Sequence, residues 1–149
     1  MALSVGEDSY TSLSDADDYW TKHAGCDNWA TASDPDKEKA LRAATQFIDK
    51  SYEFKGHHPH DSQQLLSWPR IGVIDDEGRV RNETEIPKEI KDATAWLAEQ
   101  ALQGELLPAQ SRSDKIDSIK AGDVTIDFGD GVTAQREFDF VTLLISDLI

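Results

Sequence analysis

The feature that most constrains the fold of this chain is a long amphipathic segment whose start and end are both marked. Ser33 and Asp34 are residues that cap helices, and Pro35 follows them, where the first helical residue would stand. Apolar residues then recur at steps of three and four, which predicts a helix from Pro35 to about Glu53 with one buried face. The residues of that face are Leu41, Ala44, Phe47, Ile48 and Tyr52.

A second segment of comparable length begins near Ile86 and Pro87 and ends at Gly104, a residue typical of helix ends. It carries a continuous apolar stripe. Because two such faces can cover each other, these two helices are expected to form the core pair. The residues of the second stripe are Ile90, Ala93, Thr94, Leu97, Ala98, Ala101 and Leu102.

A shorter helix is predicted from about Leu13 to Ala24. Ser12 and Asp15 form a capping box at its start, and Gly25 follows as a stop signal. Together with the two longer segments it makes three main helices. The fold class is therefore expected to be mainly α, a small helical bundle.

Beyond residue 107 the character of the chain changes. Residues 124–128 alternate between apolar and polar side chains, which is the pattern of a half-buried strand. A partner strand over 116–119 would complete a β-hairpin that turns at 121–123. The end of the chain is apolar almost all round if it is helical, so it is expected to be a helical segment that is docked rather than exposed.

These boundaries suggest the organisation of the chain. We expect a helical core over residues 1–107, with a long loop at 55–85, followed by a unit over 108–149. The second unit would consist of a linker, the β-hairpin and a C-terminal docking segment.

The net charge limits the classes of partner. The chain has 149 residues with 29 acidic and 15 basic side chains, which gives −14 at neutral pH. Most of this excess lies in residues 1–36, with a net −7, and in residues 121–149, with a net −5. Proteins that bind nucleic acids through their phosphates usually carry the opposite sign, so the composition argues against a free-standing DNA binder.

Composition also excludes several cellular settings. No apolar run approaches the roughly 20 residues that span a bilayer, so no membrane partner is expected. Residues 1–10 lack the basic and apolar regions of a secretory signal. Cys26 is the single cysteine, so a disulfide within the chain is impossible and a reducing compartment is the natural setting.

The chain contains residue types that bind metals or catalyse reactions, but their spacing matches no known metal site or catalytic motif. The grouping of His57, His58, His60 and Asp61 is metal-like, but Pro59 and the contiguous spacing suit no regular element. No motif places a serine or cysteine beside a base and an orienting group. We therefore expect no enzyme, no metal and no cofactor, while a small metal-assisted enzyme on the histidine loop stays open as a weaker alternative.

The most distinctive string of the chain is Trp68-Pro69-Arg70. Pro69 favours an extended backbone at Trp68, whose indole can seal the edge of a core while its N–H finds one partner. Arg70 could bind a carboxylate with two hydrogen bonds, within the chain or on a neighbouring subunit. These three residues are predicted to anchor the long loop.

Taken together, several strings resemble a family of tailed-bacteriophage proteins, over about residues 10–128. It is the head–tail connector, or adaptor, family, whose members are often labelled DnaT-like single-stranded-DNA-binding proteins. The most specific part of the resemblance is the tryptophan–proline–arginine string. The strings are Tyr10 with the helix that follows Ser12, Trp29 before the Asp34-Pro35 helix, Phe54-Lys55-Gly56, Leu66-x-Trp68-Pro69-Arg70-x-Gly72, and the helix from Ile86-Pro87 to Gly104.

The resemblance implies a structural virion protein without catalytic residues. It would bind the portal protein as a ring, with twelve copies expected, extend the DNA channel, and connect the head to a neck or tail-completion protein. Genomic DNA would pass through the ring without specific binding. The protein would be found at the virion neck after assembly in the host bacterial cytoplasm.

Two sets of residues are predicted to serve this role. The apolar C-terminus would dock on the portal or on a neighbouring subunit through Phe138, Phe140, Val141, Leu144, Ile145 and Leu148. The acids that would face the channel are Asp123, Asp127 and Asp130. The alternative is a single-stranded-DNA-binding replication accessory protein, which would need exposed aromatic side chains and a basic groove.

Overall fold

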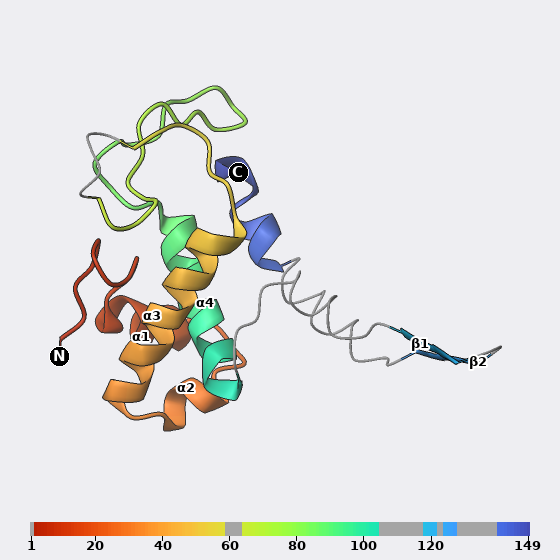
Figure 1. Ribbon diagram of the computed structural model, residues 1–149. Helices are drawn as coiled ribbons and strands as arrows, with labels where there is room; N and C mark the ends of the chain where they lie inside the picture. The colour runs from red at the N-terminus through yellow and green to blue at the C-terminus, as the bar shows by residue number, and fades with distance from the viewer. Residues whose placement is uncertain (1, 59–63, 105–117, 122–123, 128–139) are drawn as a thin grey trace.

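The computed structural model describes residues 2–58, 64–104, 118–121, 124–127 and 140–149, and for residues 118–127 only the backbone (Figure 1). It is mainly helical with little strand, as the periodicity predicted. The histidine and aspartate at 60 and 61, and the expected linker at 108–113, lie outside the described residues.

Helix α1 spans Leu13–Thr21 and begins as predicted, since the Ser12 hydroxyl accepts a hydrogen bond from the backbone N–H of Asp15 at 3.0 Å. It ends three residues earlier than expected. The chain then turns and forms a short helix, α2, over Asp27–Thr31, which the sequence pattern did not indicate.

The position of α2 depends on a single buried carboxylate. Glu99, which is 1% exposed, accepts hydrogen bonds from the backbone N–H groups of Asn28, at 3.2 Å, and Trp29, at 2.6 Å. These are N–H groups at the start of a helix, which have no partner within the helix. A side chain on α4 therefore caps α2 from outside.

The two long helices match their predicted ends closely. Helix α3 spans Asp34–Ser51, and the Ser33 hydroxyl accepts from the backbone N–H of Asp36. Helix α4 spans Lys88–Gln103. Pro87 occupies the capping position of α4 rather than its first turn, so the helix starts one residue later than predicted.

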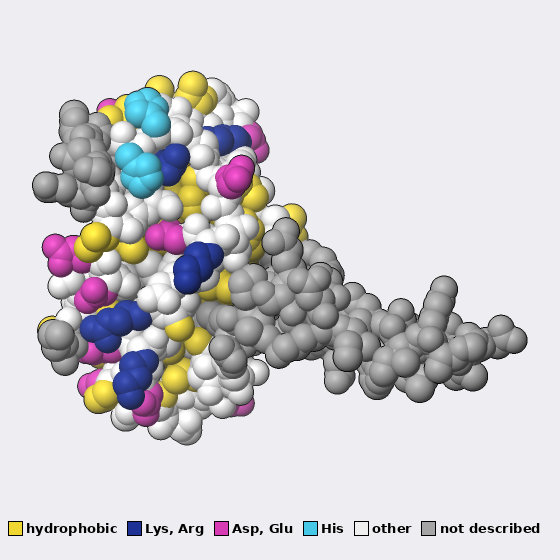
Figure 2. Space-filling view, viewed as in Figure 1, with side chains coloured by type: hydrophobic (Ala, Val, Ile, Leu, Met, Phe, Trp, Pro, Cys, Tyr) yellow, Lys and Arg dark blue, Asp and Glu magenta, His cyan; other side chains and the backbone are white. Residues whose placement is uncertain are grey.

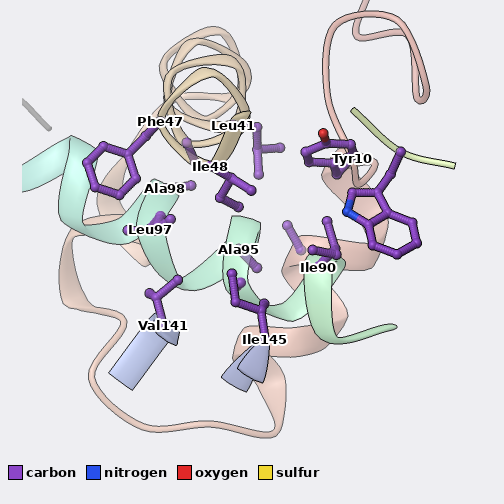
Figure 3. Packing of buried hydrophobic residues seen from close by; sticks show 14 of the residues in the cluster. Tyr10, Leu41, Phe47, Ile48, Ile90, Ala95, Leu97, Ala98, Val141 and Ile145 are labelled. Carbon is purple, nitrogen blue, oxygen red and sulfur yellow. The ribbon is translucent and has the colours of Figure 1, made fainter. Parts of the chain in front are cut away.

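The core forms where α3 crosses α4, the expected core pair, and α1 and α2 also pack against α4 (Figures 1 and 3). Tyr10, which precedes α1, closes one side of this core and is fully buried. The apolar residues from α3 and α4 that Figure 3 labels are Leu41, Phe47, Ile48, Ile90, Ala95, Leu97 and Ala98.

Two short strands pair with each other. β1 spans Ser118–Ala121 and β2 spans Val124–Asp127, antiparallel, with Ser118 opposite Asp127. β1 lies two residues later than the strand expected at 116–119. The expected turn falls partly on residues 122–123, outside the described part of the chain.

The loop at 55–85 is held by short backbone pairings. His57 and Ile71 exchange two hydrogen bonds, of 3.0 and 2.8 Å, in an isolated antiparallel bridge. Gly56 allows this close approach, because a Cβ atom there would lie 2.3 Å from the carbonyl oxygen of Ile71. The loop is therefore ordered by its own main chain over its described residues.

Candidate functional site

Trp68 lies at the centre of the ordered loop. Its side chain is fully buried and meets the ring of Phe54 edge to face, with 5.5 Å between the ring centres. The peptide bond between Trp68 and Pro69 is cis. The expected partner for the indole N–H is missing, since among the described residues Nε1 of Trp68 has no hydrogen-bond acceptor.

Within the described part of the chain Arg70 binds main-chain carbonyls, and its pairing with a carboxylate of a neighbouring subunit stays a prediction. Its Nε donates to the carbonyl of Lys55 and its Nη2 to that of Gly56, both at 2.9 Å. Nη1 lies 3.3 Å from the carbonyl of Ser67. The guanidinium thus joins the beginning of the loop to the tryptophan segment, and its planar fork suits several carbonyls at once.

A buried polar pair holds the other side of the tryptophan segment. The phenol of Tyr10 donates a hydrogen bond to the carboxylate of Asp49 on α3. The backbone N–H of Ser67 reaches both groups, at 3.1 Å from the phenol oxygen and 3.4 Å from the carboxylate. Burial raises the pKa of Tyr10 and also that of Asp49. Periodicity carries no signal for such a pair.

The C-terminal residues divide into an inner and an outer set. Val141, Ile145 and Leu148 are fully buried, and Figure 3 shows the first two against α4. The expectation that these three dock on another protein is corrected: they lie in the chain's own core, although sequence had assigned them to a separate unit. Sequence could not reveal this, because apolar residues look alike whichever chain covers them.

The outer set keeps an apolar surface. Residues 140–144 are helical, and the side chain of Phe140 is 44% exposed while that of Leu143 is 74% exposed. Leu144 is half-buried. Phe140 leans on Trp96 of α4, with 5.1 Å between the ring centres. We call Phe140, Leu143 and Leu144 the outer C-terminal face; it contains two of the predicted docking residues and adds Leu143.

Polar contacts fasten the end of the chain to the loop. The backbone N–H of Lys55 donates to the carbonyl of Leu148 at 2.8 Å. Arg81 pairs with Asp147 at 3.5 Å and with Glu89 of α4 at 2.9 Å. The root of the loop, the start of α4 and the C-terminus therefore meet at one place.

The remaining predicted site residues cannot be placed in full. Phe138, Asp123 and Asp130 lie outside the described residues. Asp127 is the last residue of β2, and its side chain is not described. The channel-facing role of the three acids therefore stays a prediction.

The tryptophans are largely unavailable for stacking on bases. Trp20, Trp29 and Trp68 are at most 6% exposed. Trp20 Nε1 donates to the carbonyl of Ala95 and Trp29 Nε1 to Asp17, while the half-buried Trp96 packs on Phe140 as described. Sequence alone left all four available as candidates.

Basic side chains are interleaved with acids. Of the eleven lysines and arginines whose side chains the structure describes, seven lie within 4.0 Å of a carboxylate. Figure 2 shows the same mixture on one face. The described part of the surface therefore offers little of the continuous basic path that a nucleic-acid backbone requires.

One groove brings lysines and aromatic rings together. It lies between α1 and the start of α4, has a volume of about 280 Å³, and is lined in part by Lys22, Lys88 and Lys91. Beside them the rings of Tyr19 and His23 stack, with 4.0 Å between their centres. Three aspartates share the lining, so the groove is mixed in charge; they are Asp15, Asp18 and Asp92.

The histidine loop shows no metal geometry where it is described. His57 belongs to the bridge with Ile71, and His58 lies 3.5 Å from Nη1 of Arg70. Among the described residues no group of three or more His, Cys, Asp or Glu side chains is arranged to hold a metal ion.

A comparison with protein-family models decides the relationship. One model, described as "Putative DnaT-like ssDNA binding protein", matches residues 2–149. The chain belongs to this DnaT-like family. No curated protein and no solved structure matches it significantly. Among the residues described for this DnaT-like protein, no helix is both long and apolar enough to cross a membrane.

Proposed function

We propose that this DnaT-like protein is a structural virion protein, a head–tail adaptor that binds the portal as a ring and connects the head to the neck. The observation that supports this most is which apolar side chains are buried and which are exposed. Three of the four tryptophans are sealed in the core. Meanwhile the outer C-terminal face leaves an apolar surface in solvent, which is typical of a protein-contact site.

The outer C-terminal face is the proposed contact to the portal or to a neighbouring subunit. Phe140, Leu143 and Leu144 follow a helical spacing of three and four, so they share one side, opposite the buried Val141 and Ile145. Because the inner residues pack in the core, the outer ones are presented rigidly. A preformed surface loses less entropy on binding than a segment that must fold first.

The acid excess suits a ring through which DNA moves. A wall of lysine and arginine would bind the duplex, which carries one negative charge per roughly 1.7 Å of its axis. A chain of net charge −14 repels it instead. We therefore propose that genomic DNA passes without specific binding.

Single-stranded-DNA binding is the second candidate function. The description of the family as DnaT-like single-stranded-DNA-binding proteins favours it. In the structure, the site for it would be the groove lined by Lys22, Lys88 and Lys91. A lysine there could bind a phosphate while the neighbouring ring of Tyr19 or His23 stacks on a base.

Two measurements on the purified protein separate these functions. The first is fluorescence anisotropy with a labelled oligothymidine and a labelled duplex near 50 mM salt, where phosphate contacts are strongest. The second is sedimentation of the protein with the portal ring of the same virus. The adaptor proposal expects portal binding and no micromolar affinity for either DNA.

A groove variant makes the test specific. Lys22→Glu combined with Lys91→Glu reverses the charge at two of the three lysines that line the groove. The control is Lys50→Glu, which changes an exposed lysine outside the groove. Micromolar binding of single strands that weakens steeply with salt, and that the groove variant loses but the control keeps, would establish the second function instead.

A further inference from the structure

The loop carries a small hairpin over residues 73–81 that is built rigidly. The backbone N–H of Asp75 donates to the carbonyl of Arg79 at 2.9 Å, and that of Arg81 to the carbonyl of Val73 at 2.8 Å. Gly78 turns the chain with φ +81°, a value that favours glycine.

A carboxylate inside the turn reinforces it. Asp75 accepts hydrogen bonds from the backbone N–H groups of Glu77, at 3.0 Å, and Arg79, at 2.8 Å. It also pairs with the guanidinium of Arg79 at 3.0 Å. These contacts, with the Arg79 backbone N–H foremost, lower the pKa of Asp75. The turn is thus ordered before any partner arrives.

The rigid hairpin holds two aliphatic side chains in solvent. Ile74 and Val80 are bridge partners on opposite arms, 51% and 66% exposed. The backbone hydrogen bonds flank this pair on both sides, so it is a non-hydrogen-bonded pair whose side chains stand close on one face. An exposed pair of β-branched residues on an ordered support is a surface presented for contact.

The tip of the hairpin carries two carboxylates, and that of Glu77 pairs with Arg79 at 2.6 Å. Asp76 and Glu77 at the tip are each 72% exposed. A hydrogen bond between Asp76 and Asp147, together with their mutual repulsion, raises the pKa of Asp147. Lys55 lies 3.9 Å from Asp76 and Arg81 lies 3.5 Å from Asp147, so each of these carboxylates has one basic partner within the chain. The carboxylate of Asp76 is still largely exposed, so a basic side chain of a partner can reach it.

Contacts also join the hairpin and the root of its loop to residues 147–148, which follow the outer C-terminal face in the chain. Arg81 at its root pairs with Asp147, and Lys55 bonds to the carbonyl of Leu148 and pairs with Asp76. Figure 1 shows the loop and the C-terminus at the same end of the molecule. A partner that covers one surface therefore lies within reach of the other.

We infer that the hairpin tip is a second docking element for the protein that the outer C-terminal face contacts. Ile74 and Val80 enter an aliphatic pocket on that partner, and Asp76 and Glu77 meet lysine or arginine side chains at the rim of the pocket. This inference rests on the proposed function, in which the partner is the portal.

The test measures binding of full-length variants to the purified portal ring. Ile74→Ser with Val80→Ser removes the apolar pair, and Asp76→Lys with Glu77→Lys reverses the tip charge. Leu65→Ser is the matched apolar control, since Leu65 is exposed on the same loop outside the hairpin. Glu83→Lys with Glu85→Lys is the charge control at two exposed positions.

We expect each hairpin variant to bind about ten-fold more weakly or worse, and each control to stay within about two-fold of the wild type. Unchanged far-ultraviolet circular dichroism and thermal midpoint establish that the variants fold. Hairpin variants that bind like the wild type overturn the inference and leave the adaptor proposal intact. A wild-type protein that does not bind the portal overturns the proposed function itself.

Discussion

The phenol of Tyr10 and the carboxylate of Asp49 are hydrogen-bonded across 39 residues of sequence, at the place where the tryptophan segment meets α3. Tyr10 is buried and Asp49 is half-buried, and both accept a hydrogen bond from the backbone N–H of Ser67. The pair is therefore a polar clamp that ties the segment before α1, helix α3 and the loop together.

Replacing Tyr10 with phenylalanine removes one oxygen from this clamp and preserves the ring. The carboxylate of Asp49 loses one of its two donors, and a hydrogen bond to a charged group contributes about 1.5–3 kcal/mol. We expect the free energy of unfolding, measured with urea, to fall by that amount. Tyr52→Phe is the matched control, since Tyr52 is half-buried and its hydroxyl contacts Thr142 at 3.1 Å; we expect a loss below about 1 kcal/mol.

The ionisation of Asp49 should make stability depend on pH with an unusual sign. Burial raises the pKa of Asp49 above its ordinary value, so the folded state holds this proton more tightly than the unfolded chain does. Its contribution is fully present below the unfolded pKa and is lost as the pH rises through the folded pKa.

Unfolding of wild type, Asp49→Asn and Asp36→Asn should be compared from about pH 2 to 7, because the effect of Asp36 develops below the ordinary pKa of a carboxyl group. We expect the wild-type free energy of unfolding to decline relative to that of the variant as the pH rises. Asp36→Asn provides the opposite sign, because hydrogen bonding to Ser33 lowers the pKa of Asp36. Its carboxylate adds stability that is lost as the pH falls. Parallel pH profiles for wild type and Asp49→Asn would contradict the assignment.

Local signals in the sequence predicted α1, α3 and α4, because capping residues and apolar periodicity act within one helix. Helix α2 was missed for a physical reason. Its N-terminus is capped by Glu99, about 70 positions away, and a five-residue helix has too few positions for a period.

The candidate site was predictable only at positions where the residue type is typically found in a single kind of environment. Trp68 beside Pro69 indicated a buried anchor, but Arg70 could have met either a carboxylate or carbonyls, and the fold selected carbonyls. Hydrophobicity alone could not divide the C-terminal residues into inner and outer sets, because both sets alternate along one short segment. That division depends on which side faces α4.

Trp68→Ala should be among the most destabilising single changes. Truncating a fully buried aromatic side chain typically costs about 3–5 kcal/mol. Leu65→Ala, at a position 73% exposed on the same loop, should stay within about 0.5 kcal/mol of the wild type. Thermal unfolding measures both. An unchanged midpoint for Trp68→Ala would place the indole at the surface and strengthen the base-stacking function.

The last prediction concerns the C-terminal segment. Truncation to alanine should lower the free energy of unfolding on its buried side and leave it nearly unchanged on its exposed side. Ile145 is fully buried against α4, so Ile145→Ala should lower the free energy of unfolding by about 2–5 kcal/mol. Leu143 is two residues away and 74% exposed, so Leu143→Ala should change it by less than about 0.5 kcal/mol.

Binding to the portal ring should reverse this order. The destabilised Ile145→Ala protein, tested well below its thermal midpoint, is mostly folded and keeps its outer face, so it should bind in proportion to its folded fraction. Leu143→Ala should bind more weakly while fully folded. If Leu143→Ala destabilised the protein as much as Ile145→Ala does, residue 143 would belong to the core, and the outer C-terminal face would not exist as a separate surface.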